Sequence, residues 1–129
     1  MIRFLLTPLG LLLFVAVASA QTARPLTSAE LQSLLANGLS VTSADIEGGR
    51  KFTGHVNMER GGRLTGTLNI VGHGQVPLNG TWKVNGAQLC RTLGPVQPEE
   101  VCETWLRAGN AKAVTVQVKG EAVSINRWQ

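Results

Sequence analysis

The spacing of the apolar residues changes after Gly38, and this change constrains the fold most. Over residues 26–38 ("LTSAELQSLLANG") leucines recur at helical spacing, whereas the later chain alternates apolar and polar side chains between frequent glycines. Short alternating runs separated by glycine-containing turns are typical of consecutive antiparallel strands. The sequence therefore predicts a mainly β fold: an antiparallel curved sheet or small open barrel of six to eight strands with one N-terminal helix.

The expected helix spans residues 28–36. Thr27 is placed to cap its N-terminus, and Glu30 stands three residues later, which is the spacing of a capping box. Leu26 and Leu31 can pack against each other across this cap. We expect the helix to cover an apolar core.

The hairpin after the helix has a register that the side chains determine. A three-residue loop at 60–62, rich in glycine, pairs Met58 with Leu64 and Phe52 with Ile70, so that the apolar residues share one face. A slip of one residue would turn them away from the core.

The opposite face of this hairpin is polar but uncharged. It carries Thr53, His55, Asn57, Thr65, Thr67 and Asn69. Two interpretations stay open: a solvated sheet face, or the inside of a cupped sheet that binds a polar ligand such as a glycan. His55, Asn57 and Thr67 are the candidate ligand-binding residues of this face.

A second hairpin is expected around Asn85-Gly86, a strong signal for a type I′ turn. This turn pairs Trp82 with Leu89 on the core face, so that Cys90 either points to the opposite face or lies at the end of the strand.

Nearer the C-terminus, Gly120-Glu121 suits a type II′ turn that pairs Val116 with Ile125. The turn near Gly109-Asn110 stays open between a two-residue and a three-residue loop. The expected core residues are Phe52, Val56, Leu68, Trp82, Leu89, Val116 and Ile125.

Residues 1–20 have the pattern of a secretory signal peptide. Arg3 precedes an apolar run, and Ala18-Ser19-Ala20 supplies the small residues that signal peptidase requires. The run is short and interrupted for a membrane anchor. We expect cleavage after Ala20, one disulfide-tied β domain over residues 21–129 without a membrane span, and a periplasmic or secreted location.

The charges are mixed along the chain. Without Arg3, eleven Lys and Arg face eight Asp and Glu, a net charge of +3. An exported chain with few aromatic residues is a poor candidate for binding nucleic acid. The expected partners are instead an anionic envelope polymer, a glycan or another envelope protein.

The two cysteines, Cys90 and Cys102, predict a disulfide, because an even number in an exported chain favours pairing. The segment between them contains Pro95 and Pro98, which disfavour a central strand there. A reactive thiol beside Arg91 would need a base, and neither histidine has a suitable spacing. Arg91 is therefore either a rim charge or the edge of a binding site.

No motif for catalysis or cofactor binding is present in the sequence. The chain has one aspartate, Asp45, and lacks a Gly-x-Ser-x-Gly elbow and a phosphate-binding loop. An envelope copper site could use His55, Met58 and His73, but His55 and Met58 fall on opposite faces of one strand and His73 falls in a turn. We expect no enzyme activity, no cofactor and no metal.

The chain resembles a small exported proteobacterial family of unknown function. The residues that carry the resemblance are Leu26 to Leu31, Gly80, Trp82, Leu89, Cys90, Arg91 and Cys102. Many members have Trp shortly after Cys-Arg, where this chain has Thr92-Leu93. The expected function is a non-enzymatic binding or envelope-associated module. The alternative is a secreted inhibitor of a hydrolase such as lysozyme, although lysozymes are typically basic and this chain is also cationic.

Overall fold

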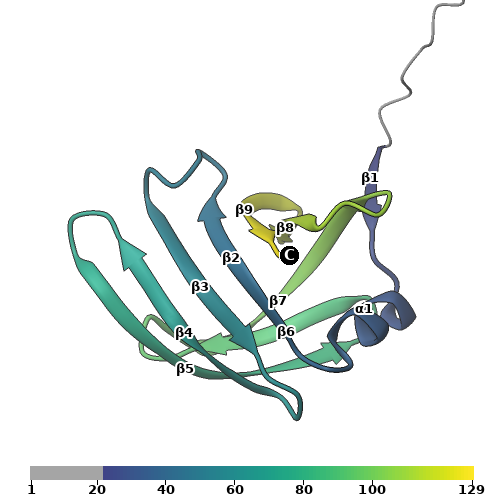
Figure 1. Ribbon diagram of the computed structural model, residues 1–129, viewed down its shortest axis with the longest axis horizontal. Helices are drawn as coiled ribbons and strands as arrows, with labels where there is room; N and C mark the ends of the chain where they lie inside the picture. Colours follow the sequence, from purple (N-terminus) through teal and green to yellow (C-terminus); the bar gives the residue numbers. More distant parts are fainter. Residues whose placement is uncertain (1–21) are drawn as a thin grey trace, which may run out of the picture.

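A computed structural model describes residues 22–129, so the predicted signal peptide lies outside the described residues. Eight antiparallel strands close into a barrel (Figure 1): each strand from β2 to β8 pairs with the next one in the sequence, and β9 pairs back with β2. A ninth strand, β1, lies outside the barrel against β7. The strand and helix bounds are β1 Ala23–Pro25, α1 Ser28–Leu35, β2 Leu39–Asp45, β3 Phe52–Met58, β4 Arg63–Ile70, β5 Gly74–Asn85, β6 Gln88–Leu93, β7 Gln97–Ala108, β8 Ala113–Val118 and β9 Glu121–Arg127. The predicted fold class is confirmed.

The helix α1 covers one end of the barrel (Figure 1). Its predicted capping box is present: the Glu30 backbone N–H donates to Thr27 Oγ1, and the Thr27 N–H donates to the Glu30 carboxylate. Arg24 of β1 also donates two hydrogen bonds of 2.8 Å to that carboxylate. Leu31 and Leu35 are completely buried in the barrel core. The helix is thus tied to the sheet at its N-terminus and closes the barrel with its apolar face.

The β3–β4 hairpin has the predicted register, with Phe52 opposite Ile70 and Met58 opposite Leu64. Gly66 lies opposite Val56, and a Cβ atom at this position would collide with the His55 carbonyl oxygen. Glycine is therefore required for the two strands to approach each other here.

The predicted register of the β5–β6 hairpin is wrong by two residues. Asn85 pairs with Gln88, so the turn residues are Gly86 and Ala87, and Trp82 lies opposite Arg91. Only Gly86 has a positive φ, of 59°, which is typical of a type II′ turn, whereas the expected type I′ turn needs two such residues. A shift of two keeps the inward and outward faces, so Trp82 still points toward the core.

The predicted register of the β8–β9 hairpin is also wrong. The turn residues are Lys119 and Gly120, both with positive φ, and a bulge follows after Val116. Val116 consequently pairs with Ser124, not with Ile125. Beyond the bulge, the observed partners on β9 differ from the expected ones by one residue. An odd difference exchanges the inward and outward faces of a strand, so Ile125 faces outward.

The β7–β8 connection follows neither of the two loops considered from the sequence. Trp105 pairs with Val116, which leaves a four-residue loop at 109–112. Arg107 is not placed against Lys112 but donates to the Ala111 carbonyl and lies over the Trp128 ring.

The connection before β7 is shorter than the prolines suggested. The strand begins at Gln97 and includes Pro98, so only residues 94–96 form the loop. Residues 97–103 pair with β6, whereas β8 pairs with β7 only at residues 104–106. Pro98 therefore lies on a strand edge that has no partner strand, so its lack of an N–H costs no hydrogen bond between strands.

The core fills the barrel end nearest α1. Most of the expected core residues lie in it or against it, but Ile125 does not, and Trp105, which the sequence did not single out, has no exposed surface. The buried apolar residues are Leu26, Leu31, Leu35, Val41, Met58, Leu64, Leu68, Leu78, Leu89, Trp105, Val114 and Val116. Among residues 22–129, no helix is both long and apolar enough to cross a membrane.

Candidate functional site

An open cavity of about 1010 Å³ lies in the barrel above the core and extends to its rim and to the edge of β7. Strands β3, β4 and β5 form one wall of this cavity, and their inward side chains are apolar. The residues of this apolar wall are Phe52, Val56, Met58, Leu64, Leu68, Ile70 and Leu78. The volume lies at the upper end of the range in which proteins hold small molecules, and eight-stranded barrels are wide enough to hold one.

A buried ion pair lies inside the cavity on β6 and β7. Arg91 Nε donates to Glu103 Oε2 at 3.1 Å, and the other oxygen of Glu103 accepts from Trp105 Nε1 at 2.8 Å. The Arg91 guanidinium also donates to the side-chain oxygen of Gln97. The side chains of Arg91 and Glu103 are only 15% and 6% exposed, so this pair is shielded from bulk water.

Further polar side chains lie inside the barrel on β2 and β9. Ser43 Oγ donates to Asn126 Oδ1 at 2.8 Å, while Ser124 and Asn126 are each only 7% exposed. All three side chains line the cavity. Ser124 and Asn126 face inward because of the bulge in the β8–β9 ladder. Ser43 faces inward because it follows the buried Val41 on β2 by two positions. We call Ser43, Arg91, Gln97, Glu103, Ser124 and Asn126 the polar wall.

The cavity opens at the end of the barrel away from α1. Rim residues that line it come from the β2–β3 loop and the β8–β9 turn, including Lys51 and Lys119. Residues on both sides of the unpaired edge of β7, such as Val101 and Cys102, also line it. A ligand can therefore enter through the rim or beside this edge, while α1 blocks the opposite end.

Asp45 organises the rim loop between β2 and β3. Its carboxylate accepts backbone hydrogen bonds from Glu47, Lys51 and Phe52 at 2.8–2.9 Å. These donors, the Phe52 N–H foremost, lower the Asp45 pKa to about 2 against the opposing effect of burial. The β2–β3 loop therefore keeps these hydrogen bonds at any pH at which the Asp45 carboxylate is ionised.

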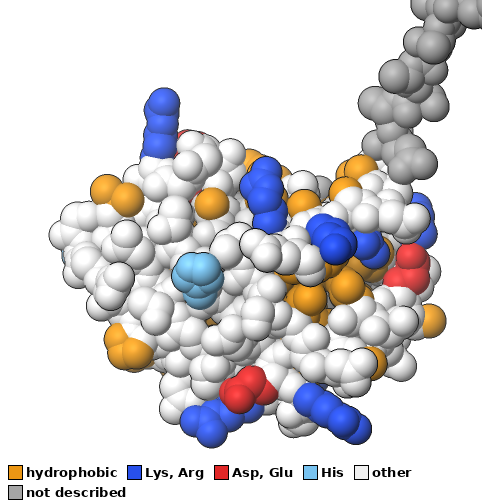
Figure 2. All heavy atoms as spheres, viewed as in Figure 1, with side chains coloured by type: hydrophobic (Ala, Val, Ile, Leu, Met, Phe, Trp, Pro, Cys, Tyr) orange, Lys and Arg blue, Asp and Glu red, His pale blue; other side chains and the backbone are white. Residues whose placement is uncertain are grey.

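The polar face predicted from the sequence lies on the outside of the barrel. His55 and Thr67 line a surface depression of about 560 Å³ over β2, β3 and β4, whereas Asn57 accepts a hydrogen bond from Ser40 beyond it. Figure 2 looks onto the side of the molecule where β2 and β3 lie in front and shows few charged side chains over its middle. Arg91 lies inside the barrel, so the four candidate ligand-binding residues do not form one site.

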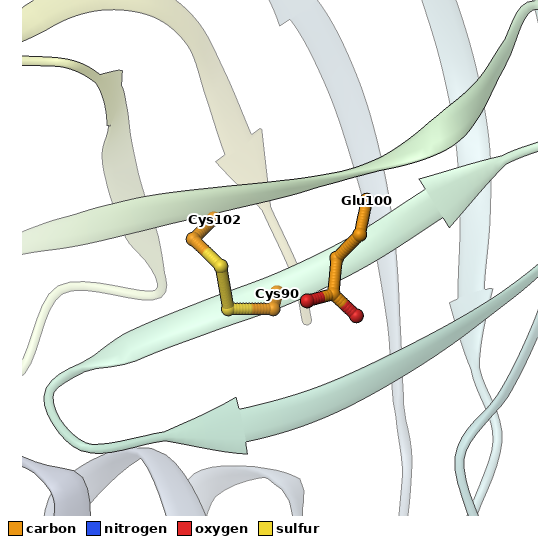
Figure 3. A group of neighbouring side chains, drawn as sticks. All are labelled: Cys90, Glu100 and Cys102. Atoms are coloured by element: carbon orange, nitrogen blue, oxygen red, sulfur yellow. A yellow bond between two sulfur atoms is a disulfide. The ribbon is translucent and has the colours of Figure 1, made fainter.

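The predicted disulfide is confirmed: Cys90 and Cys102 lie directly opposite each other on β6 and β7, with a Cα–Cα distance of 3.9 Å. Figure 3 shows the Glu100 carboxylate beside it, and Lys83 is 3.4 Å from that carboxylate. Among the described residues, Cys90, Glu100 and Cys102 are the one group of three with metal-ligating atoms close together. The bonded sulfurs have no thiolate to offer, so this cluster is not a metal site while oxidised.

The sequence contained one signal for the polar wall that the prediction did not use. Arg91 follows Leu89 by two positions, so alternation along a strand places both side chains on the inward face. Trp105 and its partner Glu103 are related in the same way. Asn126 could not be found by alternation alone, because the bulge in the hairpin reverses the expected face.

In comparisons with known proteins, no family model matches the chain, and neither a curated protein nor a solved structure matches it.

Proposed function

We propose that this protein is a non-enzymatic binding module of the periplasm or the extracellular space, and that its barrel cavity holds a small, largely apolar molecule. The observation that carries the proposal is the cavity of about 1010 Å³ with its apolar wall. Apolar surface left open to water inside a rigid barrel favours a ligand that covers it. The disulfide supports the location, since disulfides persist in oxidising compartments.

The polar wall supports binding over catalysis. Both carboxylate oxygens of Glu103 accept hydrogen bonds, from Arg91 and Trp105, so this carboxylate is held as the counter-ion of Arg91. His55 lies on the outer surface, apart from the cavity. The His55 imidazole therefore supplies no base to the cavity.

The proposal is tested by titrating the purified protein with N-phenyl-1-naphthylamine, an uncharged dye whose fluorescence rises in apolar surroundings. We expect saturable binding at one site per chain. Val56→Trp should reduce it at least tenfold, because Val56 faces the cavity opposite Gly66 and a larger side chain there fills the space.

Thr67→Trp is the matched control. It adds the same indole on the neighbouring strand, but on the outer face. Its dye binding should equal that of the unmodified protein. An equal loss in both variants, or no saturable binding in the unmodified protein, would contradict the proposal.

The alternative function, inhibition of a hydrolase such as lysozyme, uses the same disulfide-tied barrel but requires a protein partner. A lysozyme assay at micromolar protein separates the two functions. Inhibition that Val56→Trp leaves unchanged would favour the alternative.

A further inference from the structure

We propose that the cavity selects a two-faced ligand: a rigid, polycyclic molecule with an apolar face against β3–β5 and hydroxyl or carbonyl oxygens on the other face, against the polar wall. This inference rests on the proposed function and specifies its ligand class. It follows from how the polar and apolar side chains are distributed around the barrel.

The apolar side of the cavity is continuous across three neighbouring strands. Phe52 on β3, Leu68 on β4 and Leu78 on β5 all line it, and Leu68 and Leu78 are buried. Apolar side chains therefore reach from the rim deep into the barrel along this wall. A flat hydrocarbon surface is the shape that covers such a wall most completely.

The polar groups also lie deep in the barrel and not only at its mouth. Glu103 and Asn126 are as deeply buried as the leucines of the apolar wall. A linear amphiphile separates its polar and apolar parts along its length, so it would place hydrocarbon against these groups. Covering polar groups without replacing their hydrogen bonds is unfavourable.

Four polar atoms of this wall are free to bind a ligand. Within residues 22–129, no buried side-chain nitrogen or oxygen lacks a hydrogen-bond partner. Arg91 Nη2, Gln97 Nε2, Asn126 Nδ2 and Ser124 Oγ make no hydrogen bond within this part of the chain, so these atoms keep accessible surface, and their side chains line the cavity. Three of the four are donors only, which favours oxygen acceptors on the ligand.

The buried charges of the cavity do not favour a charged ligand. Arg91 and Glu103 compensate each other at depth. The other charged side chains that line the cavity, Lys51, Lys119 and Glu99 among them, are exposed at the rim. The buried part of the ligand is therefore uncharged, and any charged group that it carries would lie at the rim.

The test compares three competitors for the dye site, each below its micelle concentration. Deoxycholate carries two hydroxyls on one face, 5β-cholanate has the same rings and carboxylate without hydroxyls, and laurate is linear. We expect deoxycholate to displace the dye at a concentration about tenfold lower than 5β-cholanate, because the latter leaves the polar wall unpaired. Laurate should compete no better than 5β-cholanate.

Asn126→Leu should weaken deoxycholate about tenfold and leave 5β-cholanate unchanged or stronger. Asn57→Leu is a matched control, since Asn57 accepts the same 2.8 Å hydrogen bond from a serine, Ser40, but on the outer face. It should change neither competitor. The ratio between the two steroids in the unmodified protein tests the inference even if Asn126→Leu fails to fold.

The outcomes distinguish the two proposals. Dye binding with equal displacement by both steroids, or with strongest displacement by laurate, overturns the two-faced ligand and leaves the binding function intact. An absence of saturable dye binding overturns both.

Discussion

Breaking the buried ion pair inside the cavity should destabilise the protein strongly. In Glu103→Gln, the remaining side-chain oxygen still accepts from Trp105, but an amide N–H₂ replaces the oxygen that faces Arg91 Nε. Arg91 then becomes an uncompensated cation that is only 15% exposed. Removing one partner of a buried pair typically costs 3–5 kcal/mol, and the residual exposure of Arg91 places the expected loss near the lower value, about 3 kcal/mol.

The second change in the cycle is Arg91→Met, which removes the cation and keeps an unbranched side chain. The double variant should lose less stability than the sum of the single losses, by at least about 1 kcal/mol, because no unpaired charge is left inside. Urea unfolding followed by circular dichroism gives all four free energies. For a domain of this size, about 3 kcal/mol corresponds to a fall of roughly 12–24 °C in Tm.

Two results would refute this reasoning. A loss below about 1 kcal/mol in Glu103→Gln would mean that water screens the pair as it does on a surface. Strictly additive losses in the double variant would mean that the two side chains do not interact. Either result would contradict an ion pair that is shielded from water inside the barrel.

Three further variants test the elements that hold the barrel in shape. The double variant Cys90→Ser/Cys102→Ser opens a loop of about 13 residues and should lose about 3 kcal/mol of unfolding free energy, measured against the oxidised protein without reductant; an unchanged urea midpoint would contradict this. Thr27→Ala removes the helix cap and should lose about 1 kcal/mol, while Ser28→Ala serves as the neighbouring control. Asp45→Asn should be less stable than the unmodified protein at pH 7. Because the folded Asp45 pKa of about 2 lies below its ordinary 3.8, this stabilisation is present above pH 3.8 and is lost as the pH falls toward 2. The stability difference between the two proteins should therefore shrink over that window, and a pH-independent difference would count against the role of the carboxylate.

The elements that local sequence determines were predictable. The capping box at Thr27 and Glu30 satisfies backbone donors within one helical turn, so its pattern is readable without tertiary information. The β3–β4 register was predictable because one face of both strands is apolar, and only one loop length aligns the two faces.

The later hairpins were not predictable to the same degree, because more than one turn fits their glycines. Gly86 adopts the first position of its turn and not the second, and Lys119 takes a positive φ that non-glycine residues seldom adopt. The bulge after Val116 then reverses the inward face of β9. Closure of the barrel also depends on pairing between β7 and β8 over only three residue pairs, which no local pattern indicates.

The candidate site was partly predictable for the same reason. The disulfide followed from the even number of cysteines and the expected export, whereas the inward positions of Ser124 and Asn126 depend on a bulge. The structure places the Arg91 side chain inside the barrel, where it pairs with Glu103. The outer face around His55 is a shallow surface depression distinct from the cavity.

The most direct test of the central claim is methyl NMR of the protein, labelled at Ile, Leu and Val, during titration with N-phenyl-1-naphthylamine. Large, saturable shifts are expected for the cavity methyls of Val56, Leu68 and Leu78. The exposed methyls of Ile46 and Val71 should stay unchanged. Shifts confined to the exposed methyls, or no saturable shift at all, would contradict the claim that the barrel interior is a binding site.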